Sequence, residues 1–474
     1  MTDIVWPNST SPGARPGEGS GRLINCYAEA LESGARASFV RRRVPGLARL
    51  IATAFPGCRG FHFYNGDLYV AQSNRLSRIN VAAGVYSQVN LGALAGIGRV
   101  TFARNNKVPT PDIVCVTENG AFIVNRTTAP TSFTDPDLPQ PVTVAFLDGY
   151  FVFAIRDGRF FTSGINDITI NALDFGKAES HSGGLLNAVA FGEQLMLMGP
   201  SSVEFWQNAG NATGTPFSRS SVVARGLAST FAVAGTEYGF SSLIFIGDDN
   251  GVYRIDGGYQ PTKISNADLD RLITAVADKT LLDVTVAVTE AHAWATVSGP
   301  NFSWTYELAT GFWHERASYL DDHWRGVCSV QAFGGWVIGD RTTGDIWLLN
   351  PDIQTEGTNP LVMKAYSLPS IGFPNRVAIP RADFDIIVGQ GKVTGLDPIE
   401  VDPVCLISWS DDGGATFGTP LKRSLGRLAK YMTNVVINRA GSAGRYGRVW
   451  CFEVSDRIYV GLLGGSMDGI LRSK

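Results

Sequence analysis

The side chains best suited to chemistry in this sequence are a few carboxylates beside turns. Glu204 and Asp248 lie next to apolar runs, and Asp412 lies in the stretch Ser-Asp-Asp-Gly-Gly-Ala-Thr-Phe at 410–417. Two carboxylates about 5–10 Å apart across a cleft can hydrolyse a glycosidic bond. A long chain offers such pairs by chance, and spacing in the sequence brings no two of these residues together. We therefore predict no catalytic residue and no enzyme.

The stretch at 410–417 has a structural explanation of its own. It fits the pattern Ser-x-Asp-x-Gly-x-Thr-aromatic, the Asp-box, a hairpin motif of sialidases and other β-propellers. The Asp412 carboxylate can accept hydrogen bonds from the backbone N–H groups of a tight turn. Gly413 and Gly414 allow positive φ, and Phe417 is expected to enter a core. One copy of the motif predicts a β-hairpin, with little indication of a glycosidase.

No other pattern predicts a cofactor or a metal, and we expect neither. The five histidines, at 62, 181, 292, 314 and 323, do not pair at metal-ligand spacing. The six cysteines, at 26, 58, 115, 328, 405 and 451, are far apart, which favours buried thiols in a reducing compartment. The run Asp248-Asp249-Asn250-Gly251 lacks the alternating oxygen ligands of a calcium loop, so it predicts a turn.

The composition is that of a folded, turn-rich chain. Of 474 residues, 44% are hydrophobic and 18% charged, 54 are glycine, and the formal net charge is −3. This balance does not indicate a general nucleic-acid binder. No run of about 18 apolar residues is present that would span a membrane. The first 21 residues lack the features of a signal peptide and are expected to form a flexible arm.

A hairpin pattern recurs through the middle of the chain: an apolar run, a short polar or Gly-rich turn, and a second apolar or aromatic run. Its copies centre on Val70, Cys115, Phe153, Leu197, Phe245, Ala295 and Val337. The mean spacing, (337 − 70)/6, is about 44 residues, which is typical of four-stranded propeller blades. The pattern predicts an all-β fold with a seven-bladed β-propeller at 57–367, counted to within one blade.

The segments on either side of the propeller have other roles. The segment 39–50 precedes the first hairpin without a blade of its own, so 1–56 is expected to be an arm followed by the strand that closes the ring. The segment 266–279 predicts a short helix with an Asn cap. Residues 368–474 carry longer strands and no helix signal, which predicts an accessory domain resembling a β-sandwich.

Two groups of cations are concentrated in this weakly acidic chain. The first is Arg41, Arg42 and Arg43. Between 415 and 452 there is no acidic residue, and the basic ones are Lys422, Arg423, Arg427, Lys430, Arg439, Arg445 and Arg448. One interpretation is a solvated strand face; the other is a surface that meets DNA or an acidic partner protein. Our interface candidates are seven of these residues: Arg41, Arg42, Arg43, Lys422, Arg423, Arg427 and Lys430.

Several stretches, taken in order, resemble one known family. They are RLINCYAE at 22–29, VPGL at 44–47, SVEFW at 202–206, GDD at 247–249, GFWHER at 311–316 and SWSDDGG at 408–414. The chain resembles the tail-hub proteins of short-tailed bacteriophages, also called packaged-DNA-stabilisation or tail-nozzle proteins. The resemblance spans about residues 22–460, and the arm at 1–21 has no counterpart in it.

The resemblance implies a structural virion protein without catalytic residues. It implies a homo-hexameric ring of β-propellers in the tail, assembled in the host cytoplasm, which retains packaged DNA and forms part of the ejection channel. The implied partners are the portal-adaptor (head-to-tail connector) protein, a tailspike or tail fibre, a tail needle or plug, and the passing DNA. A glycan-binding or glycan-hydrolysing β-propeller is the alternative, and a cellular propeller scaffold is a third possibility.

Overall fold

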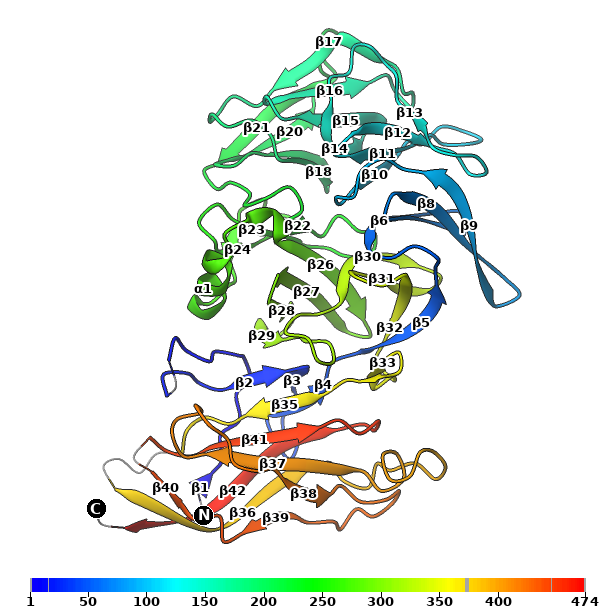
Figure 1. Ribbon diagram of the computed structural model, residues 1–474. Coiled ribbons are helices and arrows are strands. Elements are labelled where there is room, and N and C mark those ends of the chain that lie inside the picture. The colour runs from blue at the N-terminus through cyan, green and yellow to red at the C-terminus, as the bar shows by residue number, and fades with distance from the viewer. Residues whose placement is uncertain (1, 16, 371–374, 445, 473–474) are drawn as a thin grey trace.

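The computed structural model describes residues 2–15, 17–370, 375–444 and 446–472. Regular structure in these ranges is almost all β-strand; they contain one α-helix, α1 (Ala267–Ala275), and one 3-10 turn, η1 (Lys279–Leu281). A propeller of small sheets fills the upper part of Figure 1, and a domain of longer strands holding both chain ends fills the lower part. In the same ranges no helix is long and apolar enough to cross a membrane. The predicted all-β fold with a β-propeller is confirmed.

Five propeller blades are separate antiparallel sheets of four strands, each in sequence order. The first two consist of β6 (Cys58–Tyr64), β7 (Asp67–Gln72), β8 (Arg75–Ala82) and β9 (Val85–Ala93), and of β10 (Thr101–Arg104), β11 (Ile113–Thr117), β12 (Gly120–Val124) and β13 (Thr131–Ser132). The next three consist of β14 (Pro141–Leu147), β15 (Tyr150–Ile155), β16 (Arg159–Ser163) and β17 (Ile170–Lys177); of β18 (Asn187–Phe191), β19 (Gln194–Met198), β20 (Val203–Asn208) and β21 (Phe217–Val223); and of β22 (Val233–Ala234), β23 (Leu243–Ile246), β24 (Val252–Ile255) and β25 (Thr262–Lys263).

The sixth blade is completed by a strand from the N-terminal region. It contains β30 (Gly326–Ala332), β31 (Gly335–Asp340), β32 (Asp345–Asn350) and β5 (Gly46–Ala52), with β33 (Thr355–Glu356) and β34 (Asn359–Pro360) beyond them. β5 pairs antiparallel with β32 along its length, from Asn350↔Gly46 to Asp345↔Ala52. The strand that covers the edge of β32 therefore lies at 46–52, which overlaps the expected segment 39–50 and extends two residues beyond it.

The prediction of seven blades is corrected to six. Between the blades of β22–β25 and β30–β32 lie β26 (Asp283–Thr289), β27 (His292–Gly299), β28 (Phe302–Glu307) and β29 (Phe312–Glu315). These strands are not a blade of their own, because they are the first part of a nine-stranded sheet that runs on into the second domain. The repeat in the sequence counted their hairpin as a blade, but it could not show that β29 pairs with a distant strand.

That sheet continues through β2 (Arg22–Ile24), which joins the two domains. β2 pairs in parallel with β29 at Ile24↔Glu315 and antiparallel with β35 (Met363–Tyr366) at Leu23↔Ala365. The strands after β35 are β41 (Val449–Val454), β37 (Val404–Ser410) and the edge strand β38 (Leu421–Ser424). Backbone hydrogen bonding thus runs without a break from the propeller into the second domain.

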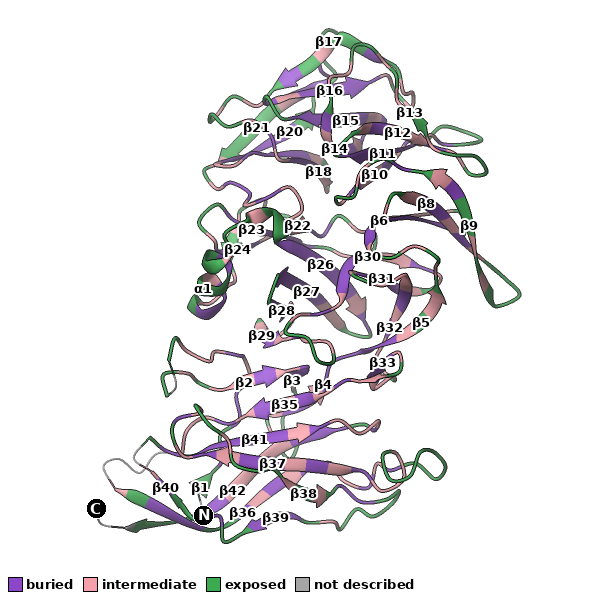
Figure 2. Cartoon of the chain, viewed as in Figure 1, coloured by how far each residue is buried: buried purple, intermediate pink, exposed green. Residues whose placement is uncertain are grey.

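A seven-stranded sheet completes the second domain. Its main path is β3 (Cys26–Ala30), β4 (Phe39–Arg43), β42 (Gly461–Arg472), β36 (Arg376–Ile386) and β39 (Val435–Asn438), with β1 (Thr2–Asp3) on β42 and β40 (Ser442–Ala443) on β36. The core between the sheets buries Trp450 and Phe452 of β41 together with Ile4 and Trp6 from the N-terminal arm. Figure 2 shows buried residues along these strands and exposed ones in the loops. Residues before 57 therefore build both domains.

The expected helix and arm meet in the structure. Asn266 caps α1 by accepting a hydrogen bond from Leu269 N at 3.0 Å, and the helix ends at 275 instead of the predicted 279. Asp268 in its first turn accepts hydrogen bonds from Ser11 Oγ at 2.7 Å and from Gly13 N at 3.2 Å. The segment expected to be a flexible arm is therefore docked on the propeller at these residues.

Glu307, at the end of β28, is a buried carboxylate that stabilises the fold when charged. Burial alone would raise the pKa of Glu307, but hydrogen bonds with His292, Thr310 N at 2.6 Å and Ala309 N at 3.2 Å lower it to about 2. The folded-state pKa is thus below the ordinary value of 4.5. The stabilisation is present above about pH 4.5 and is lost as the pH falls towards 2.

We expect Glu307→Gln to lower the melting temperature at pH 7. It should also make the melting temperature depend less on pH in the acid range, since glutamine has no charge that protonation could remove. Thermal unfolding followed by circular dichroism at about pH 7, 5, 4 and 3 measures both effects. The exposed Glu290→Gln, in the neighbouring turn, is the control and should follow the wild type throughout. Equal losses of stability in Glu307→Gln and the wild type between about pH 5 and 3 would contradict this assignment.

Candidate interaction surface

The Asp-box forms a self-contained loop after β37. Asp412 Oδ1 accepts hydrogen bonds from Ser410 Oγ at 2.6 Å and Thr416 N at 2.9 Å, and Oδ2 accepts one from Thr416 Oγ1 at 2.6 Å. The hydrogen bonds with Ser410 and Thr416 lower the pKa of Asp412. Phe417 is half-buried, with its ring 5.3 Å from that of Tyr366 in an edge-on contact, and does not enter a core. The oxygens of Asp412 are used within the loop.

The other two carboxylates considered for chemistry also have local partners. Glu204 is 1% exposed; it accepts hydrogen bonds from Ser180 N at 2.8 Å and from Trp206 Nε1 at 3.0 Å. Asp248 accepts a hydrogen bond from Arg225 at 3.0 Å. Among the residues that the structure describes, no group of three or more His, Cys, Asp or Glu side chains is placed to hold a metal ion.

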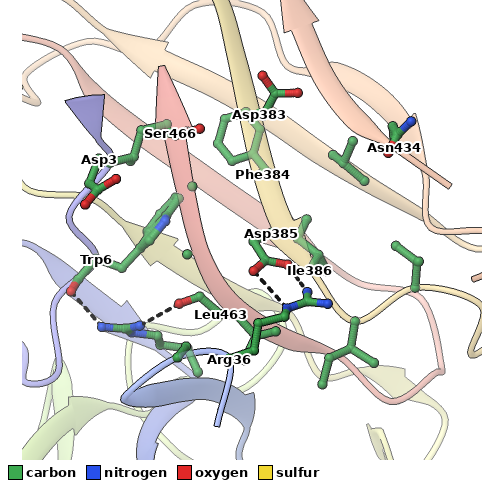
Figure 3. Close-up of a pocket in the computed structure, with 18 of the residues that line it drawn as sticks. Asp3, Trp6, Arg36, Asp383, Phe384, Asp385, Ile386, Asn434, Leu463 and Ser466 are labelled. Carbon is green, nitrogen blue, oxygen red and sulfur yellow. Dashed lines mark hydrogen bonds and ion pairs between the residues drawn. The ribbon is translucent and has the colours of Figure 1, made fainter. Parts of the chain in front are cut away.

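A hollow of about 990 Å³ lies on the seven-stranded sheet, between β1, β36, β39 and β42 (Figure 3). Asp385 on its wall forms an ion pair with Arg36, and Asp383 forms one with Arg381 at 2.6 Å. Arg41 also lines the hollow and donates hydrogen bonds to the carbonyls of Trp6 and Leu463. Two of the carboxylates that line the hollow are therefore each held by an arginine.

The arginine cluster at 41–43 does not form an exposed patch on this chain. Arg41 and Arg43 are 7% and 6% exposed and point into the second domain. Arg43 donates hydrogen bonds to the carbonyl oxygens of Val454 at 3.0 Å and Asp456 at 2.9 Å. Arg42 points the other way and forms a 3.0 Å ion pair with Glu29. The side chains alternate because Arg41–Arg43 lie on one strand, β4, whose successive residues face opposite sides.

The basic residues at 422–430 lie at the edge of the second domain. Lys422 and Lys430 are exposed, whereas Arg423 donates a hydrogen bond from Nε to the Val436 carbonyl at 2.8 Å and so links the edge strands β38 and β39. Arg427 is exposed and lies 3.4 Å from Asp402. The sequence showed no acid nearby because Asp402 comes from the loop before β37.

The basic residues between 415 and 452 do not lie together on one surface. Arg448 is 1% exposed and forms a bidentate ion pair with Asp411, with both N···O distances at 2.8 Å. Its guanidinium also lies over the rings of Trp409 and Trp450. Arg445 lies outside the described residues. The surface candidates that remain after this placement are Lys422, Arg427 and Lys430.

Two loops lie side by side next to these cations. Gly389 N donates to the Leu425 carbonyl at 2.9 Å, and Ala429 N donates to the Gly389 carbonyl at 3.2 Å. A Cβ atom on Gly391 would lie 3.1 Å from Leu428 N, so the backbones are close together. We call the two loops, 389–403 and 426–433, together with Lys422, the loop-pair surface.

Large apolar side chains are exposed on the loop-pair surface. Met432 is 92% exposed, Val393 75% and Tyr431 65%, and the other exposed members are Leu396, Ile399 and Leu428. Isolated exposed apolar residues are normal, but a cluster beside cations is typical of a protein-binding surface, in which Tyr, Met and Arg are enriched. The sequence analysis missed these apolar residues. The alternation of cations with Leu428, Tyr431 and Met432 was a possible signal, but their exposure is not visible in the sequence.

Glu400 holds the first loop in shape. Its Oε2 accepts a hydrogen bond from Leu396 N at 2.8 Å, and its Oε1 accepts one from Lys392 Nζ at 2.6 Å. The backbone adds Lys392 N to the Glu400 carbonyl at 2.7 Å. A loop that is ordered before binding loses less conformational entropy when a partner binds. The loop-pair surface is therefore preorganised on this side.

Comparison with known proteins identifies the family. A family model described as "Bacteriophage P22 Gp10, beta-propeller" (Phage_stabilise) matches residues 21–354. The chain belongs to this family. It is thus a structural phage protein of the tail-hub, DNA-stabilisation kind that the sequence resemblance indicated, and a place in the virion follows. The match ends before β35, so the loop-pair surface lies outside the part of the chain that the family model covers.

Solved structures give more distant likenesses to this phage family member. The WD40 β-propeller domain of Doa1 has a TM-score of 0.42 at 8% identity, over 64% of this chain and 97% of that one. The RRP9 WD40 repeats have a TM-score of 0.41 at 10% identity, over 65% of this chain and 99% of that one. PorZ of Porphyromonas gingivalis is a surface component of the type-IX secretion system. It has a TM-score of 0.40 at 11% identity, over 64% of this chain and 38% of that one. No curated protein sequence matches the chain.

Proposed function

We propose that the chain forms the hub, or nozzle, of a short phage tail. In this proposal six copies make a ring below the portal-adaptor protein, retain the packaged DNA and form part of the channel for its ejection. The observation that carries the proposal is membership of the phage family over residues 21–354, which include the four main strands of each blade. The further partners we propose are a tailspike or tail fibre, a tail needle or plug, and the DNA in the channel.

We propose a structural role without catalysis, and the contacts of the three candidate carboxylates support it. Glu204 is buried under Trp206 and is not open to a substrate. Asp412 is held by its own loop, and Asp248 by Arg225. A general acid needs a pKa raised towards the working pH, whereas the hydrogen bonds of Asp412 lower its pKa.

We expect Glu204→Gln, Asp248→Asn and Asp412→Asn to leave the glycan-processing activity of virions unchanged, within about twofold. The activity is measured as reducing ends released from host polysaccharide by particles carrying each variant. The isolated wild-type chain is the matched sample and should release none. Hydrolysis by the isolated chain that one of these substitutions abolishes would favour the glycosidase alternative.

We further propose that the loop-pair surface binds a partner protein of the tail. Its exposed Met432, Tyr431 and Val393 would be covered by apolar groups of the partner, and its cations would face acidic groups at the rim. DNA phosphates would pair with the cations but would leave the apolar side chains in water. A protein with an acidic rim around an apolar centre therefore fits this surface better than DNA does.

The test counts copies of the chain on purified portal-adaptor complexes and on complete tails. The charge variant replaces Lys422, Arg427 and Lys430 with Ser and keeps Arg423, which links two strands. The apolar variant is Leu428→Ser with Met432→Ser. We expect the apolar variant to reduce occupancy at least about tenfold, since truncating a central interface residue can cost over about 1.4 kcal/mol. The charge variant should reduce occupancy less, since rim charges mainly affect the rate of association. Both variants should give particles that leak DNA or lack the distal tail.

A matched control replaces three exposed cations of the propeller, Lys107, Arg156 and Lys177, with Ser. This variant should assemble normally, and all three variants should melt like the wild type, because exposed substitutions seldom cost more than about 0.5 kcal/mol. A protein partner predicts a shallow dependence of occupancy on salt, whereas DNA predicts a steep one. Normal occupancy and normal DNA retention in both loop-pair variants would mean that these residues form a solvated surface and bind no partner.

A further inference from the structure

Two cysteines that are far apart in the sequence meet where the propeller ring closes. Cys58 is the first residue of β6, in the first blade, and Cys328 lies in β30, in the last. Their sulfur atoms are 3.4 Å apart across 270 positions of the chain, and both residues are about 5% exposed. All six cysteines are free thiols in this structure.

The packing around Cys58 makes room for its sulfur beside Cys328. Gly339 of β31 pairs with Cys328, and a Cβ atom on Gly339 would lie 2.4 Å from Cys58 Sγ. Only glycine leaves this space without moving the thiol. The two sulfurs therefore face each other across the seam between blades, and a rotation about each Cα–Cβ bond can bring them towards the bonding distance of about 2.05 Å.

One cysteine of this pair, Cys328, borders a cavity that small molecules can enter. Cys328 lines the central cavity of the propeller, of about 490 Å³, together with Arg99. Arg99 lies over the Phe231 ring, 5.3 Å from its centre, and donates a hydrogen bond to the Arg59 carbonyl at 3.2 Å, so its position is fixed. Burial alone would raise the pKa of Cys328, but the hydrogen bond with Cys58 and the charge of Arg99 lower it. Lowered pKa favours the reactive thiolate at Cys328.

We propose that Cys58 and Cys328 form a disulfide that locks the first blade to the last when the protein meets a small organic disulfide. The Cys328 thiolate attacks one sulfur of the reagent and expels the other as a thiolate. The Cys58 thiolate, after losing its proton to solvent, then attacks the Cys328 sulfur of this mixed disulfide and releases the second reagent thiolate. Two protein thiols are oxidised, and one reagent disulfide is reduced to two thiols.

The redox conditions that a virion meets decide when this oxidation can occur. Thiols stay reduced in a bacterial cytoplasm, in which we propose that the protein is made, and oxidation becomes favourable outside the cell. The bond would close a loop of 270 residues that contains most of the propeller. A cross-link of this length restricts the unfolded chain strongly, so oxidation should raise the melting temperature by on the order of 5 °C or more.

The experiment treats the purified full-length chain with cystine, removes the reagent, and titrates thiols after denaturation. The reduced chain should show six thiols and the oxidised chain 6 − 2 = 4. Tryptic digestion without reductant should give one linked pair, residues 50–59 with 326–341. Cys58→Ala and Cys328→Ala should lose the linked pair and the rise in melting temperature, while Cys115→Ala, also buried in a strand, should keep both.

Gly339→Ala is a second probe, because it retains both thiols and displaces the Cys58 sulfur. We expect it to slow formation of the linked peptide at least about tenfold. Mapping on the wild type needs no variant, so the result stands even if one of the alanine variants folds poorly. Six titratable thiols after oxidation, or a linked pair between other cysteines, would overturn the proposal. An equal rise in melting temperature in Cys58→Ala would do so as well.

Discussion

Replacement of Leu47 by Asp is expected to prevent the chain from folding into a soluble protein. Leu47 lies on β5, the strand that covers the outer edge of β32, and it is fully buried in the main propeller core. A carboxylate at this position would lie in a site with no solvent. Burying an unpaired charge, together with losing the leucine contacts, costs about 4 kcal/mol or more, which is a large part of the stability of a typical domain.

The position of the strand makes the effect larger than a single core change. If β5 leaves, β32 exposes a row of unpaired backbone groups, from Asp345 to Asn350, and such an edge can pair with another chain. Gly357 N also loses its acceptor, the Leu47 carbonyl at 2.9 Å. We therefore expect aggregation as well as a lower melting temperature.

Size-exclusion chromatography and thermal unfolding test this expectation. The matched control is Arg49→Ala on the same strand, whose side chain is 56% exposed and lies 3.7 Å from Asp345. An exposed ion pair of this kind is worth about 0–1 kcal/mol, so the control should elute like the wild type and melt near it. Deletion of residues 1–52 should behave like Leu47→Asp. A deletion variant that stays soluble and melts like the full chain would show that β5 does not hold the ring closed.

The second large effect is expected for Arg43→Ala, at the joint between the N-terminal strands and the second domain. The Arg43 guanidinium donates hydrogen bonds to the carbonyl oxygens of Val454, Asp456 and Ile458, at 3.0, 2.9 and 3.4 Å. Burial lowers the pKa of Arg43 to about 10, so it remains charged at neutral pH. Alanine would remove the guanidinium donors from these carbonyls, although the Asp456 carbonyl would keep the hydrogen bond from Ile458 N at 2.9 Å. Each carbonyl left without any donor, and out of reach of water, costs about 1–3 kcal/mol.

The neighbouring Arg42→Ala is the control for Arg43→Ala. Arg42 is also on β4, but its side chain is about one-third exposed and forms an ion pair with Glu29. We expect Arg43→Ala to lower the free energy of unfolding by about 3 kcal/mol and Arg42→Ala by less than about 1 kcal/mol, both measured by urea denaturation. Equal effects of the two substitutions would mean that the carbonyl contacts of Arg43 do not hold the joint.

The arginine cluster at 41–43 shows that successive cations in a sequence need not form a charged surface patch. Three successive cations at 41–43 predict a basic patch when only the sequence is known. The structure places them on one strand, where Arg41 and Arg43 face the interior and Arg42 faces outward. Buried arginines of this kind satisfy main-chain carbonyls, because the guanidinium has five N–H donors in a fixed plane. Their role within this chain is to connect the N-terminal strands to the second domain.

The surface at 422–432 illustrates the opposite case. The sequence marked the cations, and Lys422, Arg427 and Lys430 are indeed exposed. It could not show that Asp402 lies beside Arg427, or that Met432 and Val393 project from two adjoining loops. Exposure of an apolar residue depends on which loops pack together, and that depends on contacts between residues far apart in the chain.

By itself, the sequence determined the all-β class, the propeller repeat, the local turn chemistry of the Asp-box and the phage family. Each of these depends on patterns within a few dozen residues, such as apolar alternation, turn residues and ordered motifs. Only the tertiary structure decided the blade count, the docking of the arm on Asp268, the partners of Arg43 and the meeting of Cys58 with Cys328. The physical reason is that these depend on pairings across hundreds of residues, where one strand such as β2 has the same local sequence pattern whether it ends a blade or joins two domains.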